Sequence, residues 1–326
     1  MKCLILSRMA NLYATRRLAE EGRKLDMKVL IYDTLRLSVC LDENGGKIFY
    51  RQKEIKPPHI VIPRIGSTIT AFGGCIMFQM EQMGIPLLNS SNGMFNSRDK
   101  FRSGQILTRN NLPIPRTMVL RRPSKKDIGE IDPMNRKIIL KEKIQNVITM
   151  LNGPPVVVKL NKGTQGVGVV LCDSMNDAYA QIDLMWKSKS DFIIQEFIKE
   201  SKGVDIRALV VGNKVIASMK RESKTGDFRS NTHQGGEVSA YELPDSVKNT
   251  AVEAAKIIGL NVAGVDLLIS NNGYKIIEIN SSPGFEGLEK ATGVNVAGEI
   301  MKFSKELAKK KLNKDKDLIS FKHAMG

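Results

Sequence analysis

Cysteine is scarce in this sequence of 326 residues, which has four, and no two of them form a CxxC pair. The scattered spacing indicates reduced thiols in a cytoplasmic protein rather than a disulfide framework. Long apolar runs are also missing, since none approaches the roughly 20 residues that a membrane helix needs. The run at Cys3–Leu6 is too short for a signal peptide and is expected to form a first strand. We thus expect a globular protein with no membrane partner.

Acidic residues are few relative to basic ones: 34 Asp and Glu against 50 Lys and Arg give a formal net charge of +16. This balance favours acidic partners such as nucleotides, nucleic acid, the ribosome or acidic peptides, although general solubility explains it equally well. Much of the excess lies in 121–143 and in the tail 302–322. Because both stretches are expected at the surface, they bear on partners more than on catalysis.

The first ninety residues alternate apolar runs with helical periodicity, which predicts βαβ units and a mostly parallel open sheet. The expected strands are Cys3–Leu6, Val29–Tyr32, His59–Ile62 and Ile85–Asn89, and the expected helices are Leu12–Leu25 and Thr68–Met83. Further on we expect a helix at Ser97–Asn110, a loop and helix within 121–150, a strand at 154–160, mainly strands to residue 285 with one clear helix at Ser246–Gly259, and a helix at Val296–Leu312. The fold class is therefore α/β, turning to α+β in the C-terminal half.

Two common phosphate-binding fingerprints are absent: no GxGxxG follows the first strand, and no GxxxxGK[ST] runs into a helix. Instead, three glycines within 163–168 lie in a loop that joins two apolar strands. Their backbone N–H groups can turn toward an anion, so the loop resembles a flexible flap over a nucleotide. Lys159 closes the preceding strand, where its ammonium group could reach a phosphate. The alternative is a glycine-rich hairpin turn beside an exposed lysine.

Two acids and an amide occupy an apolar hairpin near the end of the chain. Asp266 lies in its first strand and Glu278 in its second, on either side of an Asn-Asn-Gly turn. A turn centred on Asn272 places Asp266 opposite Glu278, with Asn280 on the same face. Opposed carboxylates among apolar residues repel each other and lose solvation, and a hard divalent cation relieves both costs. The hairpin therefore predicts a Mg²⁺ site, unless one acid pairs with a basic residue and the other is solvated.

Two arginines are candidates for contacts with anions. Arg207 is isolated in an apolar strand, and Arg229 lies in a polar loop. Either could clamp a phosphoryl group or a carboxylate. A structural ion pair is the alternative, and the residues alone favour it for Arg207. The apolar strand 193–198 could line an adenine pocket or simply belong to the core. His233 has no Ser or Cys partner motif, so we do not assign it as a base.

Together these features resemble the RimK family of glutamate ligases in the ATP-grasp superfamily, from about residue 5 to residue 300. The matching segments are 61–66, Arg98-Asp99-Lys100, 158–160 with the flap 163–168, the hinge 195–205, Ile206-Arg207, 228–231, 263–266 and 278–284. The last two segments are highly specific together. The chain departs from the family pattern in the longer, charged stretch 121–150 and in the lysine-rich end past Lys309.

The resemblance implies an ATP-grasp fold behind an N-terminal open parallel-sheet domain. The implied parts are a pre-ATP-grasp domain at 1–90, a central subdomain with the flap at 91–192, a C-terminal subdomain with the metal site at 193–305 and a basic tail at 306–326. The implied metal ligands are Asp266, Glu278 and Asn280, for two Mg²⁺ ions that Mn²⁺ can replace. The implied ATP-binding residues are Lys100, Lys159, Gly163, Gln165, Gly166, Gln195, Glu196, Phe197, Ile198, Lys199, Asp205, Arg207 and Arg229. The implied catalytic residues are Arg229, Arg207 and Asn231.

The implied reaction passes the γ-phosphate of ATP to a carboxylate, and the amine of L-glutamate then attacks the acyl phosphate. Lys100 and Lys159 would hold the α and β phosphates and Arg229 the acyl phosphate, while the flap excludes water. The family's best-known acceptor is the C-terminus of a small-subunit ribosomal protein, and relatives act on a coenzyme or an amino-group carrier. We expect a homo-oligomer without a direct nucleic-acid role. The competing hypothesis is a non-catalytic, ribosome-associated factor that binds nucleotide and RNA, for which two opposed acids are not required.

Overall fold

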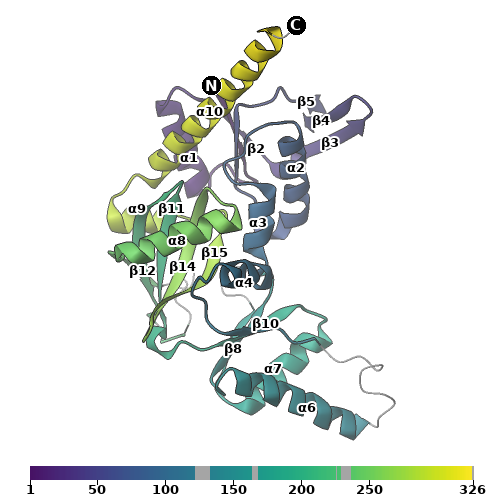
Figure 1. Ribbon diagram of the computed structural model, residues 1–326, viewed down its shortest axis with the longest axis vertical. Coiled ribbons are helices and arrows are strands. Elements are labelled where there is room, and N and C mark those ends of the chain that lie inside the picture. The colour runs from purple at the N-terminus through teal and green to yellow at the C-terminus, as the bar shows by residue number, and fades with distance from the viewer. Residues whose placement is uncertain (122–132, 164–167, 225, 229–235, 325–326) are drawn as a thin grey trace.

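The computed structural model describes residues 1–121, 133–163, 168–224, 226–228 and 236–324. Within these residues, three units follow one another along an elongated molecule (Figure 1). A parallel sheet near the N-terminus lies toward one end, a four-stranded antiparallel sheet with its helices lies at the other, and a five-stranded antiparallel sheet lies between them. The combination confirms the predicted α/β class with α+β character in the C-terminal half.

The N-terminal sheet has the strand order β2-β1-β6, and all its neighbours are parallel, as predicted. Its elements are β1 (Lys2–Leu6), α1 (Tyr13–Lys24), β2 (Lys28–Tyr32), β6 (Ile60–Pro63), η2 (Ser67–Ile69) and α2 (Thr70–Gln82). The predicted strand Ile85–Asn89 is wrong, because Leu87 and Asn89 form only isolated bridges. Pro86 has no N–H to donate, which limits the ladder there. An antiparallel meander, which was not predicted, follows β2 in the structure. It consists of η1 (Thr34–Arg36), β3 (Leu37–Asp42), β4 (Gly45–Tyr50) and β5 (Lys53–Glu54).

The predicted helix Ser97–Asn110 is in fact two helices that meet at Asp99. They are α3 (Ser91–Arg98) and α4 (Lys100–Arg109). Asp99 leaves helical geometry at φ −105° and ψ 105°, and its side chain accepts a hydrogen bond from the backbone N–H of Arg102. It therefore caps α4, as aspartate does at many helix starts. The break places Arg98 at the end of one helix and Lys100 at the start of the next.

The unit formed by the middle of the sequence, called the central unit from here on, lies at one end of the molecule (Figure 1). It is the antiparallel sheet β7-β10-β8-β9 with two helices over one face. Its elements are β7 (Thr117–Met118), α6 (Pro133–Met150), β8 (Val156–Leu160), β9 (Val169–Cys172), α7 (Met175–Lys187) and β10 (Phe192–Glu196). Helix α6 and the strand predicted at 154–160 agree with expectation. The expectation of strands at α7 is wrong, although Ser174 and Asp177 form a capping box there that the sequence displays.

The C-terminal sheet has the order β13-β12-β11-β14-β15, with all its neighbours antiparallel. Its elements are η3 (Lys199–Ser201), β11 (Val204–Val211), β12 (Lys214–Glu222), β13 (Glu237–Ala240), α8 (Asp245–Ile258), β14 (Val262–Ser270), β15 (Gly273–Asn280), α9 (Glu286–Thr292) and α10 (Val296–Ala324). Helix α8 confirms the predicted helix, and Gly259 ends it at φ 94°. Helix α10 begins where predicted but continues past Leu312 to Ala324. Among the described residues, no helix combines the length and apolar character needed to cross a membrane.

Elements far apart in the sequence share one hydrophobic core. Helix α10 lies along α1 (Figure 1), and its buried Met301 belongs to a cluster that also holds Ile5 of β1 and Leu209 of β11. Glu289 of α9 strengthens this contact, because it accepts a hydrogen bond from Tyr13 Oη at 2.6 Å. The N-terminal sheet is thus fixed to the C-terminal sheet. The core of the central unit is separate and draws only on residues within 118–194.

Gly93 allows α3 to approach the end of α8 closely. A Cβ atom at position 93 would lie 2.2 Å from the carbonyl oxygen of Gly259. We expect Gly93→Ala to lower the free energy of unfolding by about 1–3 kcal/mol in urea denaturation, because the two backbones must separate. Gly104→Ala in α4 is the control, since its Cβ would meet only Ile114 Cδ1 at 3.6 Å and alanine favours helix. Equal losses in both variants would contradict this explanation.

Candidate active site

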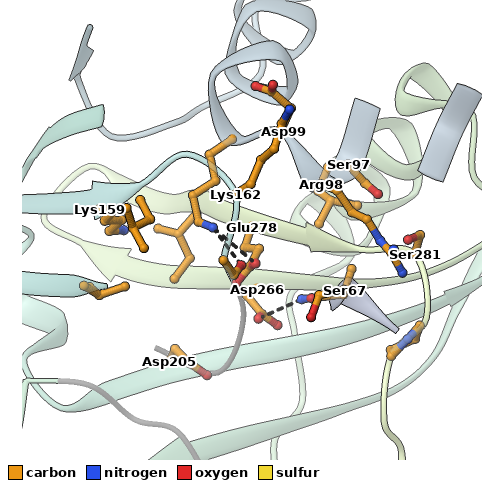
Figure 2. Close-up of a pocket in the computed structure, with 18 of the residues that line it drawn as sticks. Ser67, Ser97, Arg98, Asp99, Lys159, Lys162, Asp205, Asp266, Glu278 and Ser281 are labelled. Carbon is orange, nitrogen blue, oxygen red and sulfur yellow. Dashed lines mark hydrogen bonds and ion pairs between the residues drawn. The ribbon is translucent and has the colours of Figure 1, made fainter. Parts of the chain in front are cut away.

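A cavity of about 1130 Å³ lies where the three units meet. The central sheet contributes Val157 and Lys159, which lie on the face of β8 opposite to its helices. The C-terminal sheet contributes the acid pair Asp266 and Glu278, and the loop after β6 closes the N-terminal side. Figure 2 shows Lys159 on one side of the acid pair and Arg98 on the other.

Most of the predicted site residues line this one cavity, although they come from distant segments. They are Lys100, Lys159, Gly163, Gln195, Glu196, Phe197, Ile198, Asp205, Arg207, Asp266, Glu278 and Asn280. Lys199 stands apart, because it is exposed in η3 and outside the lining. Four of the predictions, those for Gln165, Gly166, Arg229 and Asn231, fall outside the described residues. The chemical roles assigned to these side chains stay predictions.

Asp266 and Glu278 face each other across the β14–β15 hairpin, as predicted, but the turn and the ladder that pair them differ from the predicted ones. The turn contains two residues, with Ser270 paired to Gly273, so a regular ladder would set Asp266 opposite Ile277. A bulge at Ile277 shifts the register by one residue and brings Glu278 opposite Asp266. The predicted turn centre is therefore wrong, and the bulge restores the predicted pair.

Two arginines hold Asp266. Nε and Nη2 of Arg207 donate to its two carboxylate oxygens, both at 2.7 Å, and Nη2 of Arg221 lies 3.0 Å from Oδ2. Arg221 also binds Asp205 in a bidentate pair at 2.5 and 2.8 Å. Burial alone would raise the pKa of Asp266, but the two guanidinium groups hold that pKa below its usual range. The ion pair that the residues alone favour for Arg207 is thus present.

Glu278 has a different environment. Its Oε1 atom lies 3.9 Å from Nζ of Lys100, and its side chain keeps 32% of its surface exposed. Burial raises the pKa of Glu278; Lys100 opposes this rise, and the Asp266 carboxylate adds to it. Asn280 donates from Nδ2 to Asp266 Oδ2 at 3.2 Å. Within the described part of the chain, no group donates to Oδ1, the side-chain oxygen of Asn280. Glu278 and Asn280 therefore offer oxygens to the cavity.

These oxygens fit a cation that is shared with a phosphate. Mg²⁺ prefers carboxylate and carbonyl oxygens, and it usually keeps only one or two protein carboxylates while phosphates and waters complete its shell. Glu278 and Asn280 meet that description. Asp266 fits less well, because its Oδ2 already faces three donors and only Oδ1 has a single one. No cluster of three or more His, Cys, Asp or Glu able to hold a metal occurs among the described residues, so a closed protein cage is not what they form.

Lys159 is half-buried at the cavity wall and donates from Nζ to Gln195 Oε1 at 2.6 Å. Gln195 in turn donates to Thr117 Oγ1 at 2.9 Å, which fixes its orientation. Burial lowers the pKa of Lys159 to about 8; Glu278 opposes this shift, and Lys100 adds to it. No carboxylate of the described residues forms an ion pair with Lys159. A cation in this position suits a phosphate ligand.

The low pKa of Lys159 predicts a pH dependence of ATP binding. We expect the ATP affinity to fall about tenfold between about pH 7 and pH 9, because the neutral amine attracts phosphate less. The pKa of Lys159 in the folded protein, about 8, lies below the ordinary lysine value of 10.5. The free-energy cost of burying the charged amine is therefore fully present below pH 8 and disappears as the pH rises toward 10.5. The stability of the free protein should therefore gain in the range where ATP affinity drops. Calorimetry of Lys159→Arg, which stays charged, should show a flatter pH profile; an equal slope would contradict this assignment.

The end of β10 joins the central and C-terminal sheets beside the cavity. Glu196 Oε1 accepts from Nζ of Lys275 at 2.6 Å and from the backbone N–H of Arg116 at 2.8 Å. The ring of Phe197 meets that of Phe228 edge to face, with centroids 6.3 Å apart. These contacts hold an apolar, partly aromatic wall in place, which suits a planar base.

Sequence reasoning missed Arg98, Lys162 and Arg221, which also line the cavity. Arg221 could not be found by counting from the turn after β11, because a regular ladder would place Lys220 opposite Asp205 and a bulge at Leu209/Val210 brings Arg221 there instead. Arg98 has no local signal either. Its position depends on the helix break at Asp99 and on contacts with the loop after β6.

Two family models match this chain. Residues 97–303 match the RimK-like ATP-grasp domain, and residues 1–94 match the RimK PreATP-grasp domain. A relative from Vibrio vulnificus (strain YJ016), named probable alpha-L-glutamate ligase, is 42% identical over 316 residues, which are 97% of this chain and 99% of the relative. A relative of the same name from Pseudomonas putida (strain W619) is 43% identical over 301 residues, 92% of this chain and 94% of the relative.

Solved structures share the fold at lower identity. The ATP-grasp ligase PsnB, complexed with a minimal precursor, Mg and ADP, has a TM-score of 0.69 and 20% identity, covering 94% of this chain and 98% of that one. A RimK domain protein ATP-grasp from Sphaerobacter thermophilus has a TM-score of 0.70 and 17% identity, covering 93% and 99%. ATP-grasp ligases use ATP and Mg²⁺. On the two domain matches and the full-length relatives, this protein belongs to the RimK family of ATP-grasp ligases.

Proposed function

We propose that this protein is an ATP- and Mg²⁺-dependent carboxylate–amine ligase that adds L-glutamate to an acceptor carboxylate. The observation that carries this proposal is the meeting of Lys100 and Lys159 with the acid pair Asp266 and Glu278 in one cavity. The lysines supply positive charge for phosphates, and the acid pair with Asn280 supplies oxygens for a shared cation. The names of the relatives support glutamate as the amine.

In the proposed reaction a carboxylate oxygen attacks the γ-phosphorus of ATP, and the bond from that phosphorus to the ADP oxygen breaks. The amine of glutamate then attacks the acyl carbon, expels phosphate and loses a proton, which leaves an amide. The contribution of the protein is mainly positioning and electrostatics. Lys159 and Lys100 hold phosphate oxygens, and the strand end 195–198 holds adenine and ribose. Arg207 is fixed on Asp266 through Nε and Nη2, so its Nη1 can donate to an anion.

When bound, Mg²⁺ would supply positive charge that neutralises the charge developing on the phosphates. Glu278 and Asn280 are the residues that we propose to hold it, with Asp266 contributing through Oδ1. The arginines on Asp266 orient its carboxylate for this role. A second ion and replacement by Mn²⁺ stay predictions, as does the homo-oligomeric state.

As acceptor we propose the C-terminus of a ribosomal protein. The net charge of +16 suits an acidic surface such as the ribosome. Neighbours of the same fold were solved with peptides: PsnB with a minimal precursor, and the macrocyclase MdnC with the precursor peptide MdnA. These complexes support a peptide acceptor in preference to the alternative, a small molecule or a carrier protein.

The direct test measures ADP release by the purified protein with ATP, Mg²⁺, L-glutamate and synthetic peptides that end in acidic residues. We expect release that depends on both glutamate and peptide, and a peptide that gains glutamate in mass spectrometry. L-Glutamine and D-glutamate serve as controls for the amine. ADP release that ignores both substrates would contradict the proposal. Comparing proteins and small molecules in cells with and without the enzyme would then identify the natural acceptor.

The competing function is a nucleotide- and RNA-binding factor without turnover, which the basic composition permits. It does not account for the two opposed acids Asp266 and Glu278 in the cavity, because RNA binding does not require them. Salt-dependent RNA binding that survives Asp266→Ala and Glu278→Ala, in a protein that releases no ADP, would establish that function instead.

A further inference from the structure

Two arginines at the N-terminal side of the cavity are held by oxygens of neutral groups. Arg98, which ends α3, donates from Nη1 to the carbonyl of Gly66 at 3.1 Å and to Thr70 Oγ1 at 2.6 Å, and from Nη2 to the carbonyl of Ile65. Arg64, which follows β6, donates from Nη1 to the carbonyl of Pro283 at 2.9 Å. Across the described ranges, no aspartate or glutamate forms an ion pair with either arginine.

This environment contrasts with that of Arg207 and Arg221, which also lie at the cavity wall. Arg207 and Arg221 share two carboxylates, Asp205 and Asp266, so their charge is balanced within the protein. Arg64 and Arg98 have no such balance, and burial lowers the pKa of each to about 10. A guanidinium group is still charged at neutral pH under these conditions, and withdrawing it from water is costly unless an anion reaches it.

The position of the two arginines indicates which part of a substrate would supply that anion. Arg98 lines the cavity, and Pro283, to which Arg64 is bonded, lines it as well. Figure 2 shows Arg98 and Ser281 on the opposite side of the acid pair from Lys159. Lys159, which is proposed for the ATP phosphates, and Arg98 therefore lie on different sides of the proposed reaction centre.

We propose that Arg64 and Arg98 form a second anion subsite, which binds a carboxylate of a substrate that does not itself react. This inference rests on the proposed function, in which the reacting carboxylate must lie beside the transferred phosphate. L-Glutamate brings two carboxylates that are not consumed, and an acceptor that ends in glutamate brings one. Guanidinium groups match the planar shape of a carboxylate and can bind it through two hydrogen bonds. The subsite would select acidic substrates over their neutral amides.

Calorimetry tests the subsite without requiring turnover. L-Glutamate, L-glutamine, the α-amide of L-glutamate and a peptide that ends in Glu-Glu are each titrated into protein loaded with Mg²⁺ and a non-hydrolysable ATP analogue. Arg98→Gln and Arg64→Gln should weaken the binding of L-glutamate, of the peptide, or of both, by about 10- to 100-fold, with ATP affinity unchanged. The ligand that loses affinity identifies the source of the carboxylate, and the two amides identify which carboxylate of glutamate is bound. Arg109→Gln, at the exposed end of α4, is the matched control and should behave as wild type.

A purely structural role for these arginines gives a different result. It would lower the melting temperature of the variants but leave the affinity of the folded fraction for L-glutamate and for the peptide unchanged, and this outcome overturns the proposal. If the glutamine variants do not fold, Arg98→Lys keeps the charge, and the proposal requires it to bind L-glutamate or the peptide more weakly than wild type at equal stability. A wild-type protein that binds neither L-glutamate nor the peptide also overturns it. Binding that needs the arginines, in a protein that releases no ADP, would refute the ligase function while the subsite stands.

Discussion

Glu278→Gln is expected to lower glutamate- and peptide-dependent ADP release about 1000-fold, which corresponds to about 4 kcal/mol of transition-state stabilisation. The substitution keeps the shape of the side chain but removes the charge that a cation needs. Glu278 is the acid that faces the cavity, with 32% of its side chain exposed and no guanidinium partner within the described residues. Initial rates at saturating ATP and Mg²⁺ measure this effect.

The same substitution should not destabilise the protein. Since burial raises the pKa of Glu278 above its usual value, its ionised form costs stability at neutral pH, and neutral glutamine avoids that cost. The melting temperature of the free variant should therefore equal or exceed that of wild type. Glu299→Gln, which affects a surface pair with Lys302 at 2.9 Å, is the matched control and should keep full activity. Wild-type rates in Glu278→Gln would remove Glu278 from the proposed site.

Asp266→Asn is expected to cost about 3–5 kcal/mol of unfolding free energy, in addition to activity. The loss removes one of two carboxylates that balance Arg207 and Arg221, and it leaves an uncompensated cation in a buried network. Because the guanidinium groups hold the pKa of Asp266 below its usual range, its contribution to stability is present at neutral pH and is lost as the pH falls through that lowered pKa. Urea denaturation at pH 7 measures the difference.

Asp183→Asn serves as the matched control for that measurement. Asp183 pairs with Lys187 at 2.7 Å on the surface, where 43% and 68% of the two side chains are exposed. Such a pair contributes about 0–1 kcal/mol, so this variant should stay close to wild type. A similar small change in Asp266→Asn would show that the arginine network does not depend on its charge.

The elements that carry a strong periodic pattern were predictable from sequence. The alternation of strand and helix in the N-terminal sheet and the helix α8 followed from apolar spacing alone. The acid pair was also predictable, although the bulge at Ile277 was not, because a bulge depends on how both strands fit their neighbours rather than on a local signal. The two errors of type have different causes. At Ile85–Asn89, Pro86 lacks the N–H that a regular ladder needs, and at α7 the capping box of Ser174 and Asp177 was overlooked.

The ion pairs of the candidate site were harder to predict from the sequence, because their members are distant in the sequence and come together only in the folded protein. Arg207 was weighed alone, yet it pairs with Asp266 on β14, and it shares that carboxylate with Arg221 on β12. The helix break at Asp99 was hidden, because the residues on both sides suit a continuous helix and only the capping contact reveals the start of α4. Arg98 is held by a tertiary contact with the loop after β6, and Arg64 by one with Pro283. Motifs thus located the cavity, and tertiary packing set its charge distribution.

The N-terminal and C-terminal units share a core, so the central unit is the part of the molecule that we expect to move when a nucleotide enters the cavity. Because α1, α10 and the C-terminal sheet bury their side chains together, the N-terminal sheet is fixed to the sheet that carries the acid pair, and the two form one block. The central unit has its own core and is joined to that block through the segments on either side of 118–194. ATP entry should therefore be a swing of the central unit, which carries Lys159 toward a stationary carboxylate pair. Substrate and metal would bind to the block formed by the N- and C-terminal units, and the nucleotide would bind to the central unit that moves.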